Sequence, residues 1–175
     1  MWEHIKMKGD TMIEYRKINI NEERKLRNLI DTVLSGLERK EFFIPFNEEE
    51  LKDMFNQDKV IIYGAFDGEE LVGTAQLYFD ESYTKDIKEI LNMNNCKMAE
   101  LGGYLVLDQY RNQGIMKVLQ DRLINELKNI NYEYAIITVH PDNIASNKTT
   151  EYTGAKNVKT TMLGNYLRNI YLLKL

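Results

Sequence analysis

The chain contains few of the residues that build disulfide frameworks and metal centres. Its 175 residues include one cysteine, Cys96, and two histidines, His4 and His140. A single cysteine excludes an internal disulfide and is typical of a protein from a reducing cytoplasm. A zinc site would need carboxylates for most of its ligands, because so few histidines and thiols are present. We therefore expect a cytoplasmic protein without a metal centre.

The sequence also lacks long apolar runs. No segment approaches the roughly 20 apolar residues that span a bilayer, so no membrane partner is expected. Residues 1–11 have neither the apolar core of a signal peptide nor a periodic apolar pattern. We interpret them as an N-terminal tail whose deletion costs little stability.

Positive charge is scarce as well. The formal net charge at pH 7 is -4. Nucleic-acid-binding surfaces depend on clustered lysine and arginine, so no nucleic-acid partner is expected. Internal repeats, low-complexity runs and linkers are also missing from the sequence. Residues 12–175 are therefore expected to form one domain, since a chain of this length builds one core more readily than two.

What the chain does have is apolar periodicity in short segments. Residues 13–20 alternate as a strand, and residues 21–37 carry apolar side chains at helical spacing. A hairpin turn is predicted at residues 67–70. Residues 80–97 are the least regular, and only a short helix at residues 86–93 is indicated there. In full, strands are expected at residues 13–20, 60–66, 71–79, 98–107, 132–139, 157–163 and 167–175, with further helices at residues 48–55, 115–130 and 143–153.

The most informative segment is LVLDQYRNQGIMKVL, residues 105–119. A short apolar strand runs into a turn at residues 108–114, which opens directly into an amphipathic helix. The first backbone N–H groups of a helix have no intrahelical partner and lie at the positive end of its dipole. Gly114 lets a phosphate approach this main chain closely. The segment therefore predicts an anion-binding site.

A second strand–turn–helix unit follows it. Residues 132–139, YEYAIITV, are rich in aromatic and β-branched side chains and predict a buried strand. Pro141 interrupts the pattern, and Asp142 or Asn143 then caps a helix. Gly154 stands where a glycine is expected just past the end of that helix.

Together the two units resemble the cofactor motifs of the GNAT N-acetyltransferase superfamily. Residues 111–116 are similar to the family's R-x-x-G-x-G/A turn, with Met116 in place of the usual glycine or alanine. Asn143 and Ser146 match the next motif, N-x-x-S/A, which leads a short helix ending near a glycine. The two motifs stand in the family's order, with a helix and a strand between them.

The resemblance, over residues 12–175, implies an α/β (α+β) fold. The family fold is a mixed central sheet of about seven strands, splayed at the cofactor site and flanked by about four helices. The order of the predicted strands and helices matches this fold. The implied cofactor is acetyl-CoA, with CoA as product. In the family, CoA lies along the motif strand, in the turn after it and against the second motif. The residues expected to bind it are Tyr104, Leu105, Val106, Leu107, Arg111, Asn112, Gln113, Gly114, Ile115, Met116, Asn143 and Ser146.

The resemblance also indicates catalytic residues. Glu100 stands eleven residues before Arg111, the offset at which histone-acetylating members carry a catalytic glutamate. Its carboxylate would take the amine proton, and the alternative interpretation is a solvated strand end. Many members carry a tyrosine acid where this chain has Thr150, and Tyr152 faces elsewhere on the helix. Tyr166, before the last strand, is the remaining candidate for the acid, although it also suits an ordinary turn.

The acceptor is expected against the parts of the chain that carry no motif. Candidate walls of its pocket are Phe42, Phe43, Phe46 and Tyr83, although most aromatic side chains belong to cores. The acidic residues near them suit a cationic amine or form a solvated helix face; they are Glu38, Glu41, Glu48, Glu49 and Glu50.

These residues predict acetyl transfer to the primary amine of a small molecule, by direct attack in a ternary complex. One alternative is an N-acetyltransferase of proteins or peptides, acting on an N-terminus or a lysine. An open groove between Phe42 and Tyr83 would favour it. The other alternative is a sensor that binds acyl-CoA without turnover. The expected partners are the small-molecule amine and, in a homodimer, a second copy of the chain.

Overall fold

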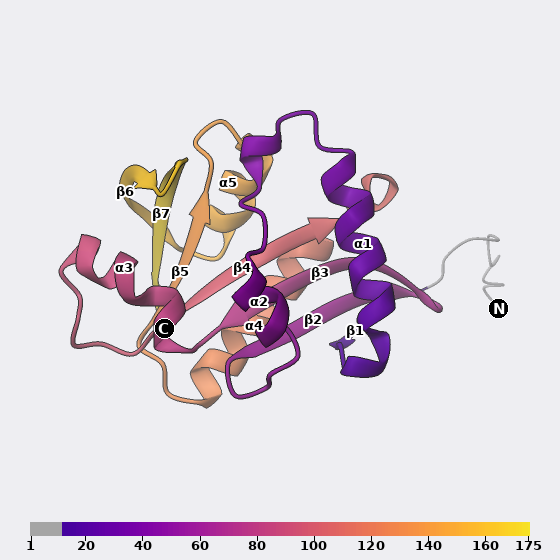
Figure 1. Ribbon diagram of the computed structural model, residues 1–175, viewed down its shortest axis with the longest axis horizontal. Helices are drawn as coiled ribbons and strands as arrows, with labels where there is room; N and C mark the ends of the chain where they lie inside the picture. Colours follow the sequence, from indigo (N-terminus) through magenta and orange to yellow (C-terminus); the bar gives the residue numbers. More distant parts are fainter. Residues whose placement is uncertain (1–11) are drawn as a thin grey trace, which may run out of the picture.

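A seven-stranded sheet forms the centre of the structure, a computed structural model that describes residues 12–175 (Figure 1). The strands are β1 (Glu14–Lys17), β2 (Val60–Asp67), β3 (Glu70–Tyr78), β4 (Met98–Val106), β5 (Tyr134–Val139), β6 (Lys156–Leu163) and β7 (Tyr166–Lys174). Their order across the sheet is β1-β2-β3-β4-β5-β7-β6. Neighbouring strands are antiparallel except for β4 and β5, which are parallel. The expected mixed sheet is confirmed, whereas the expected tail at residues 1–11 lies outside the described residues.

Helices cover both faces of the sheet. They are α1 (Glu23–Ser35), α2 (Glu48–Asp53), α3 (Glu81–Leu91), α4 (Ile115–Asn129) and α5 (Ile144–Tyr152), with short 3-10 turns η1 (Ile20–Glu22), η2 (Lys40–Phe42) and η3 (Asp108–Tyr110). Figure 1 shows α1, α2 and α3 in front of the sheet and α4 behind it. No helix within residues 12–175 has the length and apolar content needed to cross a membrane.

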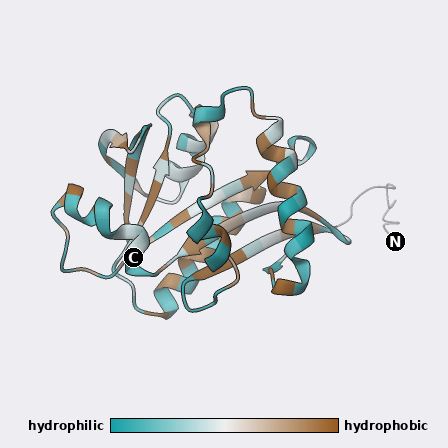
Figure 2. Ribbon diagram, viewed as in Figure 1, coloured by the Kyte–Doolittle hydropathy of each residue, from teal (hydrophilic) through white to brown (hydrophobic). Residues whose placement is uncertain are grey.

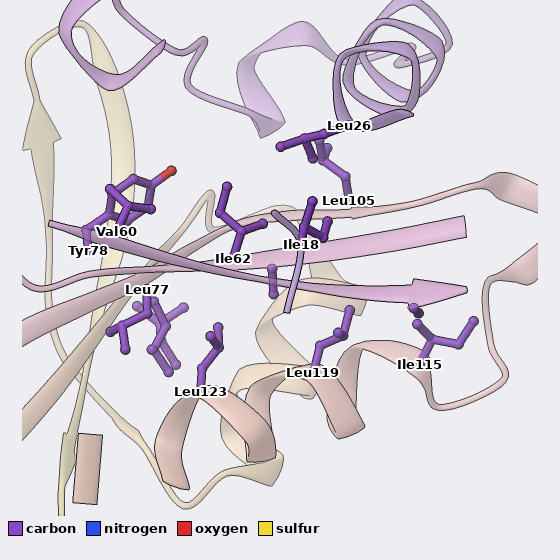
Figure 3. Packing of buried hydrophobic residues seen from close by; sticks show 14 of the residues in the cluster. Ile18, Leu26, Val60, Ile62, Leu77, Tyr78, Leu105, Ile115, Leu119 and Leu123 are labelled. Atoms are coloured by element: carbon purple, nitrogen blue, oxygen red, sulfur yellow. The ribbon is translucent and has the colours of Figure 1, made fainter. Parts of the chain in front are cut away.

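The apolar periodicity of the sequence accounts for the two layers of core. Leu26 and Leu29 of α1 are buried against one face of the sheet, and Leu119 and Leu123 of α4 are buried against the other. Figure 3 shows Leu26 on one side of the strands and Leu119 and Leu123 on the other. In Figure 2 the hydrophobic residues lie mainly along the strands and the inner sides of the helices. Burying apolar side chains on both faces is the main driving force for folding of such a sheet.

Two elements differ from the prediction because of their caps. Helix α3 begins at Glu81 instead of residue 86, because the Asp80 side chain accepts a hydrogen bond from the Ser82 amide and starts the helix early. Strand β1 ends at Lys17 instead of residue 20. Asn19 forms a capping box with Glu22, which turns the chain into η1 at this point.

The sheet opens between β4 and β5. Only residues 98–100 of β4 pair with β5, through residues 134–136, although both strands continue past this ladder. Farther along β4, a bulge sets Ala75 of β3 opposite both Gly103 and Tyr104. Gly103 has φ 61°, a backbone conformation that residues other than glycine rarely adopt. Because a bulge bends its strand, β4 leaves β5 and the expected splay results.

Candidate active site

A cleft of about 1110 Å³ occupies the opening between β4 and β5. Residues from both sides of the sheet line it. On one side are Ile115 and Met116 of α4, the α5 cap Asn143 and Ser146 of α5, and on the other is the segment that precedes α2. A cleft that passes through a splayed sheet can place a long cofactor on one side and an acceptor on the other.

The turn before α4 presents uncapped backbone N–H groups to this cleft. Asn112 and Gly114 have φ values of 61° and 78°, and no side chain of the described residues caps the first turn of α4. The amides of that turn have no partner within the helix and point to its N-terminal end. A Cβ atom at Gly114 would meet nothing within 4 Å, so the space in front of the amides is open. This geometry fits the pyrophosphate of CoA.

Basic side chains surround the same turn. The Arg111 guanidinium lies 2.9 Å from the Asp108 carboxylate, and its Nε donates to the Val106 carbonyl at 3.4 Å. The Lys117 ammonium lies 4.2 Å from the centre of the Tyr152 ring. Asp108 offsets part of the charge of Arg111, and Lys117 adds positive charge to the helix dipole, so the end of the cleft nearest α4 favours an anion.

Most of the predicted cofactor-binding residues line the cleft, and two do not. The Leu107 amide donates to the Val72 carbonyl, and the Gln113 side chain donates to the Gln109 carbonyl at 3.1 Å. Those that line it are Tyr104, Leu105, Val106, Arg111, Asn112, Gly114, Ile115, Met116, Asn143 and Ser146.

Asn143 is both a helix cap and a cleft residue. Its side chain accepts a hydrogen bond from the Ser146 amide at 3.2 Å, which starts α5. Thr150, farther along α5, is fully buried, and its hydroxyl has no hydrogen-bond partner among the described residues. Tyr152 is 59% exposed and does not line the cleft, so it faces elsewhere, as predicted.

Glu100 lies where β4 and β5 separate. Its side chain borders the cleft and is otherwise enclosed by protein. Burial raises the pKa of its carboxyl to about 8, and the nearby charge of Glu50 acts in the same direction. A hydrogen bond with the Thr138 side chain partly opposes this shift. Glu100 is therefore a group that changes protonation near neutral pH, which the interpretation as a solvated strand end does not explain.

Glu50 is a second carboxylate of the cleft. The sequence suggested a solvated acidic helix face, whereas Glu50 turns inward and lines the cleft, and burial raises the pKa of its carboxyl. The cause is a capping box, in which Asn47 accepts from the Glu50 amide at 2.9 Å and the Glu50 carboxylate accepts from the Asn47 amide at 2.7 Å. The pattern Asn-x-x-Glu was visible in the sequence and could have identified this orientation.

The predicted aromatic walls all line the cleft. The rings of Phe43 and Phe46 lie 5.3 Å apart, and Phe42 lies 5.3 Å from the His140 ring. Tyr83 borders the cleft as well, and its hydroxyl donates to Asp53 at 3.1 Å.

Tyr166 does not line the cleft. Its ring lies 5.3 Å from the guanidinium of Arg168, and it is Arg168 that borders the cleft from β7. The geometry therefore does not favour Tyr166 as the general acid. Sequence reasoning missed Arg168, because an arginine inside a strand carries no motif. No group of three or more His, Cys, Asp or Glu side chains in residues 12–175 is arranged to hold a metal ion.

The sequence matches the model of the acetyltransferase (GNAT) family over residues 32–154, a range that contains β4, the turn before α4 and α5. The chain belongs to the GNAT family of acetyltransferases. It is an acyltransferase whose cofactor is acetyl-CoA. The turn at residues 111–116 and the splay beside β4, described above, are the parts of this chain that fit the cofactor.

Solved structures with the same fold are distant in sequence. An N-acetyltransferase from Staphylococcus aureus Mu50 is 19% identical, with a TM-score of 0.66 over 93% of this chain and 97% of that chain. A chain of the NatC complex bound to Gag peptide and CoA is 18% identical, with a TM-score of 0.71 over 93% of this chain and 98% of that chain. Arabidopsis thaliana NAA60 in complex with acetyl-CoA is 16% identical, with a TM-score of 0.72 over 94% of this chain and 100% of that chain. These likenesses support the fold, and no curated protein sequence matches the chain significantly.

Proposed function

We propose that the protein transfers the acetyl group of acetyl-CoA to the primary amine of a small molecule, by direct attack in a ternary complex. The observation that carries this proposal is the position of Glu100. Its carboxyl has a pKa of about 8 and borders the cleft that also contains the uncapped amides of α4. A base is most effective when its pKa lies near the working pH.

Acetyl-CoA supplies a thioester, and the transfer forms an N–C bond, breaks the C–S bond and leaves CoA as a thiol. Glu100 would take the proton that the amine loses. The main-chain groups of Val106 and its neighbours on β4, which do not pair with β5, would bind along the cofactor. The turn at residues 111–116 would hold the pyrophosphate.

The cleft contains features that suit an amine of small size. Phe42, Phe43, Phe46 and Tyr83 provide apolar walls on the acceptor side. Glu50 and Glu100 place carboxyl groups beside them, and a protonated amine would be attracted to this end before it loses its proton. A homodimer and a cytoplasmic location stay predictions.

A protein or peptide acceptor is the alternative. The NatC structure named above was bound to a peptide, and this chain has the same fold as a chain of that complex. A peptide would need to extend from the cleft past Phe42 and Tyr83, whereas a small amine would be enclosed between them. A sensor without turnover is less consistent with a carboxyl group whose pKa lies near neutrality.

Release of CoA across a panel of small amines, antibiotics and peptides tests the proposal. We expect turnover with at least one class of small amine and weak turnover with peptides. Glu100→Gln should lower kcat by roughly 10² or more, while acetyl-CoA binding stays near wild type. Turnover confined to peptides would favour the alternative. Binding of acetyl-CoA without CoA release to any member would indicate a sensor.

A further inference from the structure

Arg168 is a buried cation at one end of the cleft. It is 1% exposed and is among the largest fully buried side chains of the described residues. It borders the cleft together with Leu163, the last residue of β6, and Gly164, in the turn between β6 and β7. Arginine stays protonated at any physiological pH, so this end of the cleft carries a fixed positive charge.

The guanidinium has main-chain partners and no carboxylate partner within residues 12–175. It donates to the Leu167 carbonyl at 2.8 Å and to the Glu41 carbonyl at 2.9 Å. The carboxylate of Glu41 is engaged by Arg39 at 2.7 Å. The charge of Glu41 attracts the guanidinium without forming a salt bridge with it, so the charge of Arg168 is only partly compensated, and burying such a charge is costly.

Arg168 and Glu100 lie on the same face of the sheet. Glu100 is in register with Ile136, two residues before Thr138 on β5. Thr138 is in register with Ile170 of β7, and Arg168 lies two residues before Ile170. Because side chains alternate along a strand, all of these point to one face. The cleft therefore has an acidic group near the splay and a basic group at the β7 end.

We propose that the acceptor amine also carries a carboxylate, which Arg168 binds while its amino group faces Glu100. The inference rests on the proposed acetyl transfer to a small amine and names the class of that amine. A planar guanidinium binds a carboxylate through paired, charge-assisted hydrogen bonds. The aromatic walls suit an apolar group between the two charged ends, as in an apolar amino acid.

A purely structural role for Arg168 is the competing explanation. Its bond to the Glu41 carbonyl links β7 to η2, so its loss could loosen the wall that contains Phe42. A structural role would weaken all acceptors alike. An anion-binding role would weaken only those with a carboxylate, so the ratio between matched acceptors separates the two.

The experiment compares CoA release with phenylalanine, phenylalaninamide and phenethylamine, and with the dipeptide Gly-Phe and its amide. The dipeptide distinguishes a free amino acid from a peptide terminus as the source of the carboxylate. Wild-type protein should prefer either phenylalanine over phenylalaninamide or Gly-Phe over its amide. The ratio of kcat/KM values should be on the order of 30 or more, because the carboxylate would form a buried charge pair with Arg168. Arg168→Met should abolish the preference, and Arg168→Lys, a point charge without the planar fork, should reduce it.

Arg39→Met is the matched control. Arg39 lies in the same region and also contacts Phe42, but it is 45% exposed and already paired with Glu41 and Asp142. Its replacement should leave the ratio of acid to amide unchanged. Melting temperatures with acetyl-CoA establish that each variant is folded.

Equal turnover of acids and amides by wild-type protein would overturn the carboxylate proposal and leave the acetyl transfer intact. If no amine is acetylated, the transfer proposal fails. The carboxylate proposal is then tested by a binding measurement. N-acetylphenylalanine should then bind the CoA-loaded wild-type protein more tightly than its amide, as measured by calorimetry. Equal binding of the two would exclude a carboxylate site even if Arg168→Met does not fold.

Discussion

Gly114 combines open space with a backbone conformation that disfavours other residues. Its φ is 78°, and a Cβ atom there would have no neighbour within 4 Å. Gly68, in the β2–β3 turn, has φ 58° and equally open surroundings but lies outside the cleft lining. The two glycines therefore carry a similar conformational cost of substitution, about 1–3 kcal/mol, but only Gly114 lines the cleft.

We predict that Gly114→Glu abolishes the rise in melting temperature caused by acetyl-CoA, because a carboxylate would stand against the phosphates. Gly68→Glu should lower the melting temperature of the free protein about as much as Gly114→Glu does. Its melting temperature should still rise when acetyl-CoA is added. The measurement is thermal unfolding with and without acetyl-CoA. A normal cofactor response in Gly114→Glu would show that the pyrophosphate does not bind at this turn.

The pKa of Glu100 predicts how activity depends on pH. The active form of a base is the carboxylate, so kcat/KM should rise through a pKa of about 8 in wild-type protein. The amine contributes a rising limb of its own. Glu50→Gln separates the two, because Glu50 raises the pKa of Glu100 but not that of the free amine. The Glu100 limb should move to lower pH in this variant, which keeps its capping box. An unmoved profile would mean that another group is the base.

The same pKa predicts how stability depends on pH. The folded pKa of about 8 is higher than the ordinary 4.5, so the native state holds a proton that the unfolded chain releases. The free energy of unfolding should therefore decrease from about pH 4.5 to about pH 8 because of this group, and stay unaffected outside this window. Glu100→Gln should remove this part of the dependence in urea unfolding measured across that range. An identical slope in both proteins would contradict the burial of Glu100.

At the level of elements, the bulge in β4 is the feature that opens the site. Gly103 adopts φ 61°, and a Cβ atom there would lie 3.0 Å from the Gln76 side chain. At Gly102 a Cβ atom would make an ordinary contact of 3.5 Å with Tyr78. The bulge therefore depends on glycine at position 103 and not at position 102.

We expect Gly103→Ala to lower the free energy of unfolding by about 1–3 kcal/mol, and Gly102→Ala to change it little. Gly103→Ala should also weaken acetyl-CoA binding, since the path of β4 past β5 depends on the bulge. Chemical unfolding and calorimetric titration would measure the two effects. Equal stability of both variants would show that the bulge tolerates a side chain.

At the level of the whole molecule, the cleft divides the sheet into two parts. Strands β1 to β4 form one part and β5, β7 and β6 the other, and the ladder at residues 98–100 connects them. Residues of both parts line the cleft, from β4 and the turn before α4 to Asn143 and Ser146. A cofactor in the cleft therefore contacts both parts and stabilises their arrangement.

Acetyl-CoA at a hundredfold excess over its dissociation constant should stabilise the fold by about 2.7 kcal/mol. For a domain of this size, this corresponds to a rise in melting temperature of roughly 5–10 °C. Differential scanning calorimetry with acetyl-CoA, and with ATP as a phosphate-bearing control, would measure it. A similar rise with ATP would indicate binding of phosphates without recognition of the pantetheine.

Local sequence determined most of the elements and the cofactor motifs. The turn at residues 111–116 and the cap at Asn143 each lie within a few consecutive residues, so their geometry follows from neighbouring side chains and backbone preferences. The mixed sheet and its splay, by contrast, were expected from a family resemblance, and the order of the strands came only from the structure. The early start of α3 was missed because its cap, Asp80, follows a strand directly and its apolar spacing is weak at the start.

The acceptor side was decided by tertiary structure. Glu50, Glu100 and Arg168 come from α2, β4 and β7, which are far apart in the chain and meet only in the folded sheet. A side chain's pKa and its access to a cleft depend on which groups surround it, and those groups are brought together by long-range packing. The sequence therefore determined that this protein binds acetyl-CoA, and only the fold decided which charged groups line the cleft.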